Sequence, residues 1–61
     1  MAEVELTELK DRDGKRYQVV WDDYSEKLWA KYIPTGHHYL VGKAENPTEA
    51  VYKVQAWIAS Q

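Results

Sequence analysis

The chain has 61 residues, a formal net charge of −2 and no cysteine. This length makes one domain rather than two, and the missing cysteines exclude a disulfide framework and thiol chemistry. A dedicated nucleic-acid binder normally carries a strong excess of basic residues, which this chain lacks. A domain this small buries only about 60% of its unfolded surface, so its three tryptophans and five tyrosines are expected to supply a dense core.

The first half of the chain contains three segments with strand character. Glu3–Leu9 alternates apolar and polar residues at its start, which predicts an edge strand; a short helix is the alternative, since Glu and Leu favour helices. After a turn at Asp11–Gly14, the aromatic and β-branched residues of Lys15–Trp21 predict a strand. Asp22–Lys27 is polar and reverses the chain, and Leu28–Ile33 predicts the third strand.

The second half contains one more strand and the only long helix signal. A turn at Pro34–Gly36 precedes His37–Lys43, which predicts the fourth strand. The helix is expected over Asn46–Ser60, because Asn46 is a preferred N-cap residue and Glu49 is placed to reach back to it. The apolar residues of this segment recur on one helical face, namely Ala50, Val51, Val54, Trp57 and Ile58.

This order of elements predicts a single α+β domain over residues 1–61. We expect an antiparallel meander of three to four strands with one C-terminal helix packed on one face, in the order β-β-β-β-α. The residues expected beneath the helix, on the inner face, are Tyr17, Val19, Trp21, Leu28, Ala30, Tyr32 and Leu40.

The opposite face of the sheet is also expected to be apolar. Its apolar members are Val20, Trp29, Ile33, Tyr39 and Val41, interleaved with Arg16, Gln18, Lys31 and Lys43. A solvated sheet face is normally polar, so this composition is the most informative feature of the sequence.

Three interpretations of this face remain open. The aromatics only stabilise cross-strand pairs, or the face binds a protein, most simply a second copy in a homodimer. The third is a nucleic-acid platform on which Trp29 and Tyr39 stack on bases while Lys31, Lys43 and Arg16 meet phosphates. We favour a protein-interaction surface, with the residues Trp29, Tyr39, Ile33, Val41, Val20 and Lys31.

No cluster of residues predicts a metal site. His37 and His38 are adjacent on a strand and so point to opposite faces, which prevents them from sharing one ion. The carboxylates of Asp22, Asp23 and Glu26 lack the alternating ligands and the glycine of a calcium loop.

Catalytic and cofactor motifs are also missing. Ser25 and Ser60 have no histidine partner in any recognised motif, and there is no glycine-rich phosphate loop. So small a fold is not expected to enclose a ligand-sized pocket. We therefore expect a non-enzymatic protein with no cofactor, metal or small-molecule substrate.

Nothing in the sequence predicts a membrane partner. The N-terminal stretch is acidic and lacks the apolar core of a signal peptide, and no apolar run is long enough to span a bilayer. We expect a soluble, cytoplasmic protein.

The step from the last strand into the helix, E-N-P-T-E-A-V-Y-K-V-Q-A-W-I, resembles the strand-to-helix step of HicB-type antitoxin domains. It is also similar to that of the arm-type DNA-binding domains of some tyrosine recombinases, in which three strands enter the major groove and one helix braces them. The resemblance covers roughly the last half of the chain. It implies a small sheet followed by a helix and assigns no role to any residue.

Overall fold

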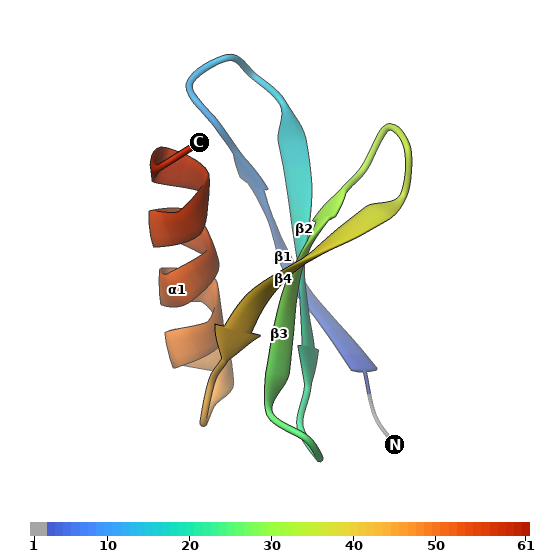
Figure 1. Cartoon of the computed structure of the whole chain (residues 1–61), viewed down its shortest axis with the longest axis vertical. Helices are drawn as coiled ribbons and strands as arrows, with labels where there is room; N and C mark the ends of the chain where they lie inside the picture. The colour runs from blue at the N-terminus through green and yellow to red at the C-terminus, as the bar shows by residue number, and fades with distance from the viewer. Residues whose placement is uncertain (1–2) are drawn as a thin grey trace.

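The computed structural model describes residues 3–61 and shows one antiparallel sheet with one helix against it (Figure 1). The strands are β1 (Glu3–Lys10), β2 (Arg16–Asp22), β3 (Lys27–Tyr32) and β4 (His37–Lys43), and they pair in the order of the sequence. The helix α1 spans Pro47–Ala59. The predicted α+β meander is confirmed with all four strands in one sheet, and the first segment is a strand rather than a short helix.

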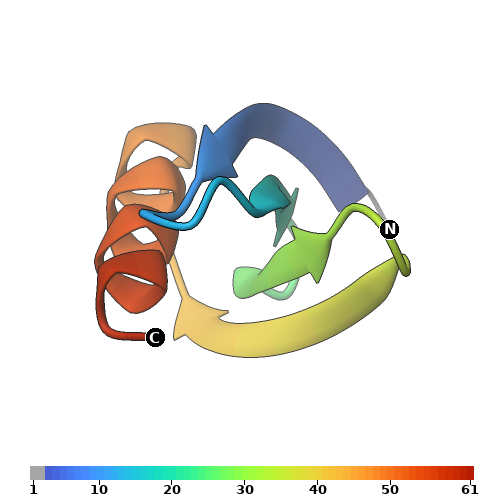
Figure 2. The same cartoon turned by 90° about the horizontal axis from the view of Figure 1, so that it is seen from above.

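The sheet is strongly twisted, and only one of its faces is covered. In Figure 1 the edge strands β1 and β4 cross in projection, with β2 and β3 running between them. This right-handed twist follows from the backbone sterics of L-residues. Figure 2 looks down the long axis and shows α1 on one side of the sheet, with no element of residues 3–61 on the other. We call these sides the inner face, under α1, and the outer face.

The inner face and α1 together bury the hydrophobic core. Its members are Tyr17, Val19, Trp21, Leu28, Ala30, Ala44, Ala50, Val54 and Ile58. The largest fully buried side chains are Leu28, Val19 and Val54. Burying such side chains contributes roughly 1.5–3 kcal/mol each. The apolar face predicted for α1 is therefore confirmed, with Val51 and Trp57 packed at its half-buried margin.

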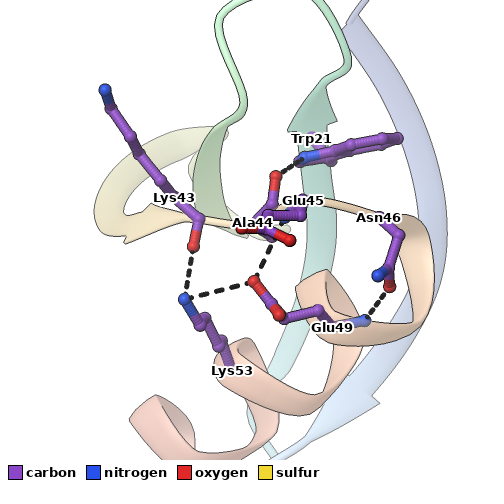
Figure 3. Close-up of polar contacts among 7 residues, drawn as sticks. All are labelled: Trp21, Lys43, Ala44, Glu45, Asn46, Glu49 and Lys53. Atoms are coloured by element: carbon purple, nitrogen blue, oxygen red, sulfur yellow. Dashed lines mark hydrogen bonds and ion pairs between the residues drawn. The ribbon is translucent and has the colours of Figure 1, made fainter.

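The start of α1 is fixed by a small network of polar contacts (Figure 3). The side-chain oxygen of Asn46 accepts a hydrogen bond from the backbone N–H of Glu49 at 2.8 Å, as expected of an N-cap. The Glu49 carboxylate accepts from the N–H of Glu45 at 3.1 Å, one residue before the position that a capping box uses. Lys53 lies 3.4 Å from that carboxylate and donates to the carbonyl of Lys43 at 2.7 Å.

A second contact in Figure 3 ties the sheet to the segment that leads into α1. The indole Nε1 of Trp21 donates to the carbonyl oxygen of Ala44 at 2.9 Å, and both residues are buried. A buried carbonyl without a partner is costly. This hydrogen bond therefore holds the β4–α1 connection against β2.

The prediction for β4 is wrong about which face its residues lie on. Ala30 pairs with Tyr39 and Trp29 pairs with Leu40, so Tyr39 lies on the inner face and Leu40 on the outer face. A β-bulge then interrupts the β3–β4 register, and Val41 packs against the core. Tyr39 and Val41 are therefore inner-face residues, whereas Leu40 is 64% exposed.

The physical reason for this error is that alternation alone does not set register. A period of two tells which residues of one strand share a face, but the neighbouring strand decides which face that is. Here the β3–β4 connection determines the pairing of Tyr32 with His37, and the bulge then changes the alternation within β4. Neither the pairing set by the connection nor the bulge can be recognised from the alternation of apolar and polar residues.

Candidate interaction surface

The outer face is made of the alternate residues of the four strands that point away from α1. Its apolar members are Val20, Trp29, Ile33 and Leu40. Its charged or titratable members, placed there by the strand register, are Glu3, Glu5, Glu8, Lys10, Arg16, Asp22, Lys27, Lys31, His38 and Lys43. The face thus combines a small apolar centre with charged surroundings, as protein interfaces do.

The apolar centre is a cross-strand row of three residues. Trp29 pairs with Val20 on one side and with Leu40 on the other. Val20 is only 3% exposed although no element covers it. Its cross-strand neighbours are Trp29 and Glu5, and Lys31 of β3 lies 3.7 Å from the Glu5 carboxylate. Trp29 remains half-buried, and Leu40 is the most exposed apolar residue of the sheet.

The β1 side of the outer face is held by a second ion pair. The guanidinium of Arg16 binds the Glu8 carboxylate through two hydrogen bonds, at 2.6 and 3.0 Å. The same contact lowers the pKa of Glu8 from its ordinary value. Because both groups are largely exposed, this pair contributes little to stability. It does hold the Arg16 guanidinium and the Glu8 carboxylate in a fixed position on the face.

One end of the outer face carries an ordered row of four charges. Glu3 pairs with Asp22, and Lys27 pairs with Lys43. The row therefore runs anion, anion, cation, cation from β1 to β4. Like charges placed directly opposite each other destabilise a sheet, and no ion pair within residues 3–61 relieves either lysine.

Asp22 keeps its negative charge in this row. Its carboxylate accepts the backbone N–H of Tyr24 at 2.9 Å and of Ser25 at 3.4 Å, forming the turn after β2. These contacts, that of Tyr24 first, lower the pKa of Asp22 from its ordinary value. This turn-forming carboxylate, which is only 8% exposed, is thus held ionised.

Four of the six residues predicted for the interaction surface lie together on the outer face: Trp29, Ile33, Val20 and Lys31. The other two, Tyr39 and Val41, lie on the inner face, and the prediction missed Leu40. The missed residue is the direct cross-strand partner of Trp29. The apolar centre therefore includes Leu40 and not Tyr39.

Tyr39 belongs instead to an aromatic cluster beside α1. Its ring centroid lies 5.5 Å from that of Trp57 and 4.4 Å from that of His37. Trp57 in turn contacts Tyr17 edge-on at 5.8 Å, and Tyr17 lies 5.4 Å from Tyr32. Burial in this cluster raises the pKa of Tyr17. The cluster extends the core toward the exposed edge strand β4.

The remaining candidates for chemistry do not assemble into a site. His37 and His38 pair with Tyr32 and Lys31, on opposite faces, and residues 3–61 hold no group of three or more His, Asp or Glu side chains placed to bind a metal ion. A hollow of about 450 Å³ that opens to solvent lies between the β1–β2 turn and the end of α1. Its lining includes Leu9, Lys10, Arg12, Asp13, Tyr17 and Ile58.

Comparisons with known proteins leave the surface as the main guide to function. No protein-family model matches the chain, and no curated protein or solved structure matches it. The resemblance at the start of the helix therefore gains no support from them. Within residues 3–61 no helix has the length and apolar character needed to cross a membrane.

Proposed function

We propose that this chain is a small, non-enzymatic interaction module that binds a protein through its outer face. The observation that carries the proposal is the Trp29–Leu40 pair, which keeps a half-buried indole and a 64% exposed leucine side by side on a face that nothing in residues 3–61 covers. Binding a partner would remove this apolar surface from water, which is favourable. The surrounding charges would form the polar rim.

A cytoplasmic location is part of the proposal. The lack of cysteine supports it, because a chain without thiols needs no oxidising compartment to fold.

The nucleic-acid alternative has less support than the sequence alone gives it. Tyr39, one of its two stacking residues, packs against Trp57 on the inner face. Glu5 and Glu8 lie on the same face as Lys31 and would repel phosphates. Trp29 and the lysines of β3 and β4 remain for this role, together with Arg16, which is paired with Glu8.

A photo-crosslinking experiment in cells tests the proposal. A photoreactive amino acid replaces Leu40 on the outer face, and a matched control replaces Tyr52, which is 77% exposed on α1. We expect protein adducts from position 40 and few from position 52. A position-40 variant that folds, shown by its circular dichroism spectrum, and yields no protein adduct above the control would overturn the proposal. An adduct with nucleic acid alone would replace it with the alternative.

A further inference from the structure

The charges of the outer face are arranged so that the face complements a copy of itself. β3 and β4 contribute Lys27, Lys31 and Lys43 and contain no carboxylate, whereas β1 contributes three glutamates. At one end the row runs Glu3, Asp22, Lys27, Lys43 from β1 to β4. When a second copy of this row is laid over it in the reverse order, each anion faces a cation. Opposite potentials that face each other favour association and set its register.

We infer that the partner of this face is a second copy of the chain, stacked outer face to outer face about a two-fold axis parallel to the strands. The inference rests on the proposed function and names its partner. Closed two-fold dimers are the commonest assemblies of identical chains. In such a dimer each copy contributes the same surface, so a self-complementary order of charges is the feature to look for.

The twist of the sheet limits the possible axes. A twisted sheet is a saddle-shaped surface, as the crossing of β1 and β4 in Figure 1 shows. A two-fold axis lying in the interface, either parallel or perpendicular to the strands, keeps two such saddles evenly spaced. A diagonal axis makes one pair of corners collide while the other pair separates. Two orientations therefore remain.

The charges select the parallel axis. It places β1 over β4 of the second copy and β2 over its β3, because the strand order is reversed from one copy to the other. Glu3 then faces Lys43 of the second copy, and Asp22, whose buried carboxylate is bound to its own turn, lies over its Lys27. The acidic pair of each copy, Glu3 and Asp22, thus lies over the basic pair of the other copy, Lys27 and Lys43. Each contact occurs twice in the dimer.

A perpendicular axis gives a poorer match. It moves the charged row of one copy to the opposite end of the other. Glu3 would then lie over Lys10 and Asp22 over Arg16, but Lys27 would lie over Ile33 and Glu5 over Glu8. The lysines of the row would meet no carboxylate there. The parallel axis also stacks Trp29 over Val20 of the second copy, because these two residues share one cross-strand row. This contact would bury Trp29 and Val20 in the middle of the interface, with Leu40 at its edge over Glu5 of the second copy.

The size of the face predicts how strong the dimer is. Four strands spaced by about 4.8 Å, with seven residues rising about 3.3 Å each, give a face of roughly 20 by 23 Å. The area of this face is therefore smaller than the roughly 800 Å² that each partner buries in a standard stable interface. The dimer is therefore weak and dissociates on dilution, and salt weakens it further because Glu3, Lys27 and Lys43 are exposed.

Charge reversal tests the arrangement directly. Sedimentation equilibrium at low salt, over about 1 µM to 1 mM protein, compares the wild type with Lys43→Glu, with Glu3→Lys and with the double variant. Each single reversal places two like-charged contacts in the dimer and should raise the dissociation constant about tenfold. The double reversal restores opposite charges at both contacts and should bring the constant back near that of the wild type. An equimolar mixture of the two single variants should form the mixed dimer.

Matched controls carry the same charge changes in the β1–β2 turn, beyond the end of the face. Lys15→Glu and Asp13→Lys are exposed and should leave the dissociation constant within about twofold of wild type. The inference is overturned if the wild type stays monomeric across the range, or if the double variant associates as weakly as the single ones. If the protein is monomeric but the photoreactive residue at position 40 forms adducts with another protein, the inference of a homodimer is overturned and the proposed function stands. A monomer without adducts overturns the proposed function as well.

Discussion

The two faces of the sheet each present a tryptophan paired with a leucine, and the pairs have opposite fates. On the inner face Trp21 pairs with Leu28, and both side chains are buried. On the outer face Trp29 pairs with Leu40, and both keep contact with water. The residue types and the cross-strand relation are the same, so the difference comes from what lies above them. The inner pair has α1 as its cover, and the outer pair has no cover within residues 3–61.

This comparison separates residues that hold the fold together from residues that are available for binding. Hydrophobic burial stabilises the folded chain only where the chain itself supplies the cover. A chain of this length has a total stability of about 3–9 kcal/mol. Inner-face substitutions should therefore reach a large share of that total, whereas outer-face substitutions should affect association and leave stability nearly unchanged.

The two leucines give the largest expected contrast. Leu28→Ala should lower the free energy of unfolding by about 2–5 kcal/mol, because Leu28 is fully buried and its removal leaves a cavity. Leu40→Ala should change it by less than about 0.5 kcal/mol. Urea unfolding followed by circular dichroism measures both. If Leu28→Ala does not fold, Leu28→Val gives a smaller change of the same sign. Equal effects at the two positions would remove the distinction between the faces.

The two tryptophans sharpen the contrast through one hydrogen bond. Trp21→Phe removes the indole N–H that donates to the buried carbonyl of Ala44, and we expect a loss of about 1–3 kcal/mol. Trp29→Phe is the matched control, since it makes the same change of ring on the half-buried outer face. Its effect on unfolding should be smaller, while its effect on self-association should be larger. Thermal unfolding at low protein concentration separates the two quantities. A larger loss of stability from Trp29→Phe would contradict the comparison.

The local features of this fold were predictable from the sequence because local chemistry determines them. Asn46 caps the helix through its own side chain, and the spacing of Val54 and Ile58 fixes the buried side of α1. The strand alternation of β2 likewise places Val19 on one face and Val20 on the other. Each of these inferences depends on residues that are close along the chain.

The candidate site was predictable only in part because it depends on pairing between strands. Placing Leu40 beside Trp29 requires the β3–β4 register, which the connection and the bulge determine. The opposition of Glu3 to Asp22 and of Lys27 to Lys43 requires the register of both edge strands. The ion pair between Lys31 and Glu5 likewise crosses an intervening strand. Such information lies between segments and has no signature within any one of them.

A third experiment destabilises the helix α1, which covers the inner face, and leaves the sheet unchanged. Asn46→Ala removes the side-chain oxygen that accepts the N–H of Glu49, and we expect a loss of about 1 kcal/mol. Thr48→Ala, an exposed position two residues later, is the control and should cost less than about 0.5 kcal/mol. Hydrogen exchange should show faster opening of α1 in Asn46→Ala. A change in stability without faster exchange in the first turn of α1 would show that Asn46 acts elsewhere.

The smallest expected effect is a dependence of stability on acid, and it arises on the outer face. The pKa of Asp22 is lower in the folded chain than its ordinary value, because its carboxylate accepts the N–H groups of Tyr24 and Ser25. Folding therefore favours the charged carboxylate. This contribution is present at neutral pH, decreases once the pH falls below about 3.9, and is lost as the pH falls through the lowered pKa of the folded state.

Urea unfolding between about pH 5 and pH 2 measures this contribution. Asp22→Asn retains an oxygen that can accept the same hydrogen bonds but does not titrate, so its stability should fall less steeply with acid than that of the wild type. Asp13→Asn, in the exposed β1–β2 turn, is the matched control and should keep the wild-type slope. Glu8 and Glu49 also have lowered pKa values, so part of the slope should survive in every variant. An unchanged slope in Asp22→Asn would mean that the turn after β2 does not require the charge of Asp22.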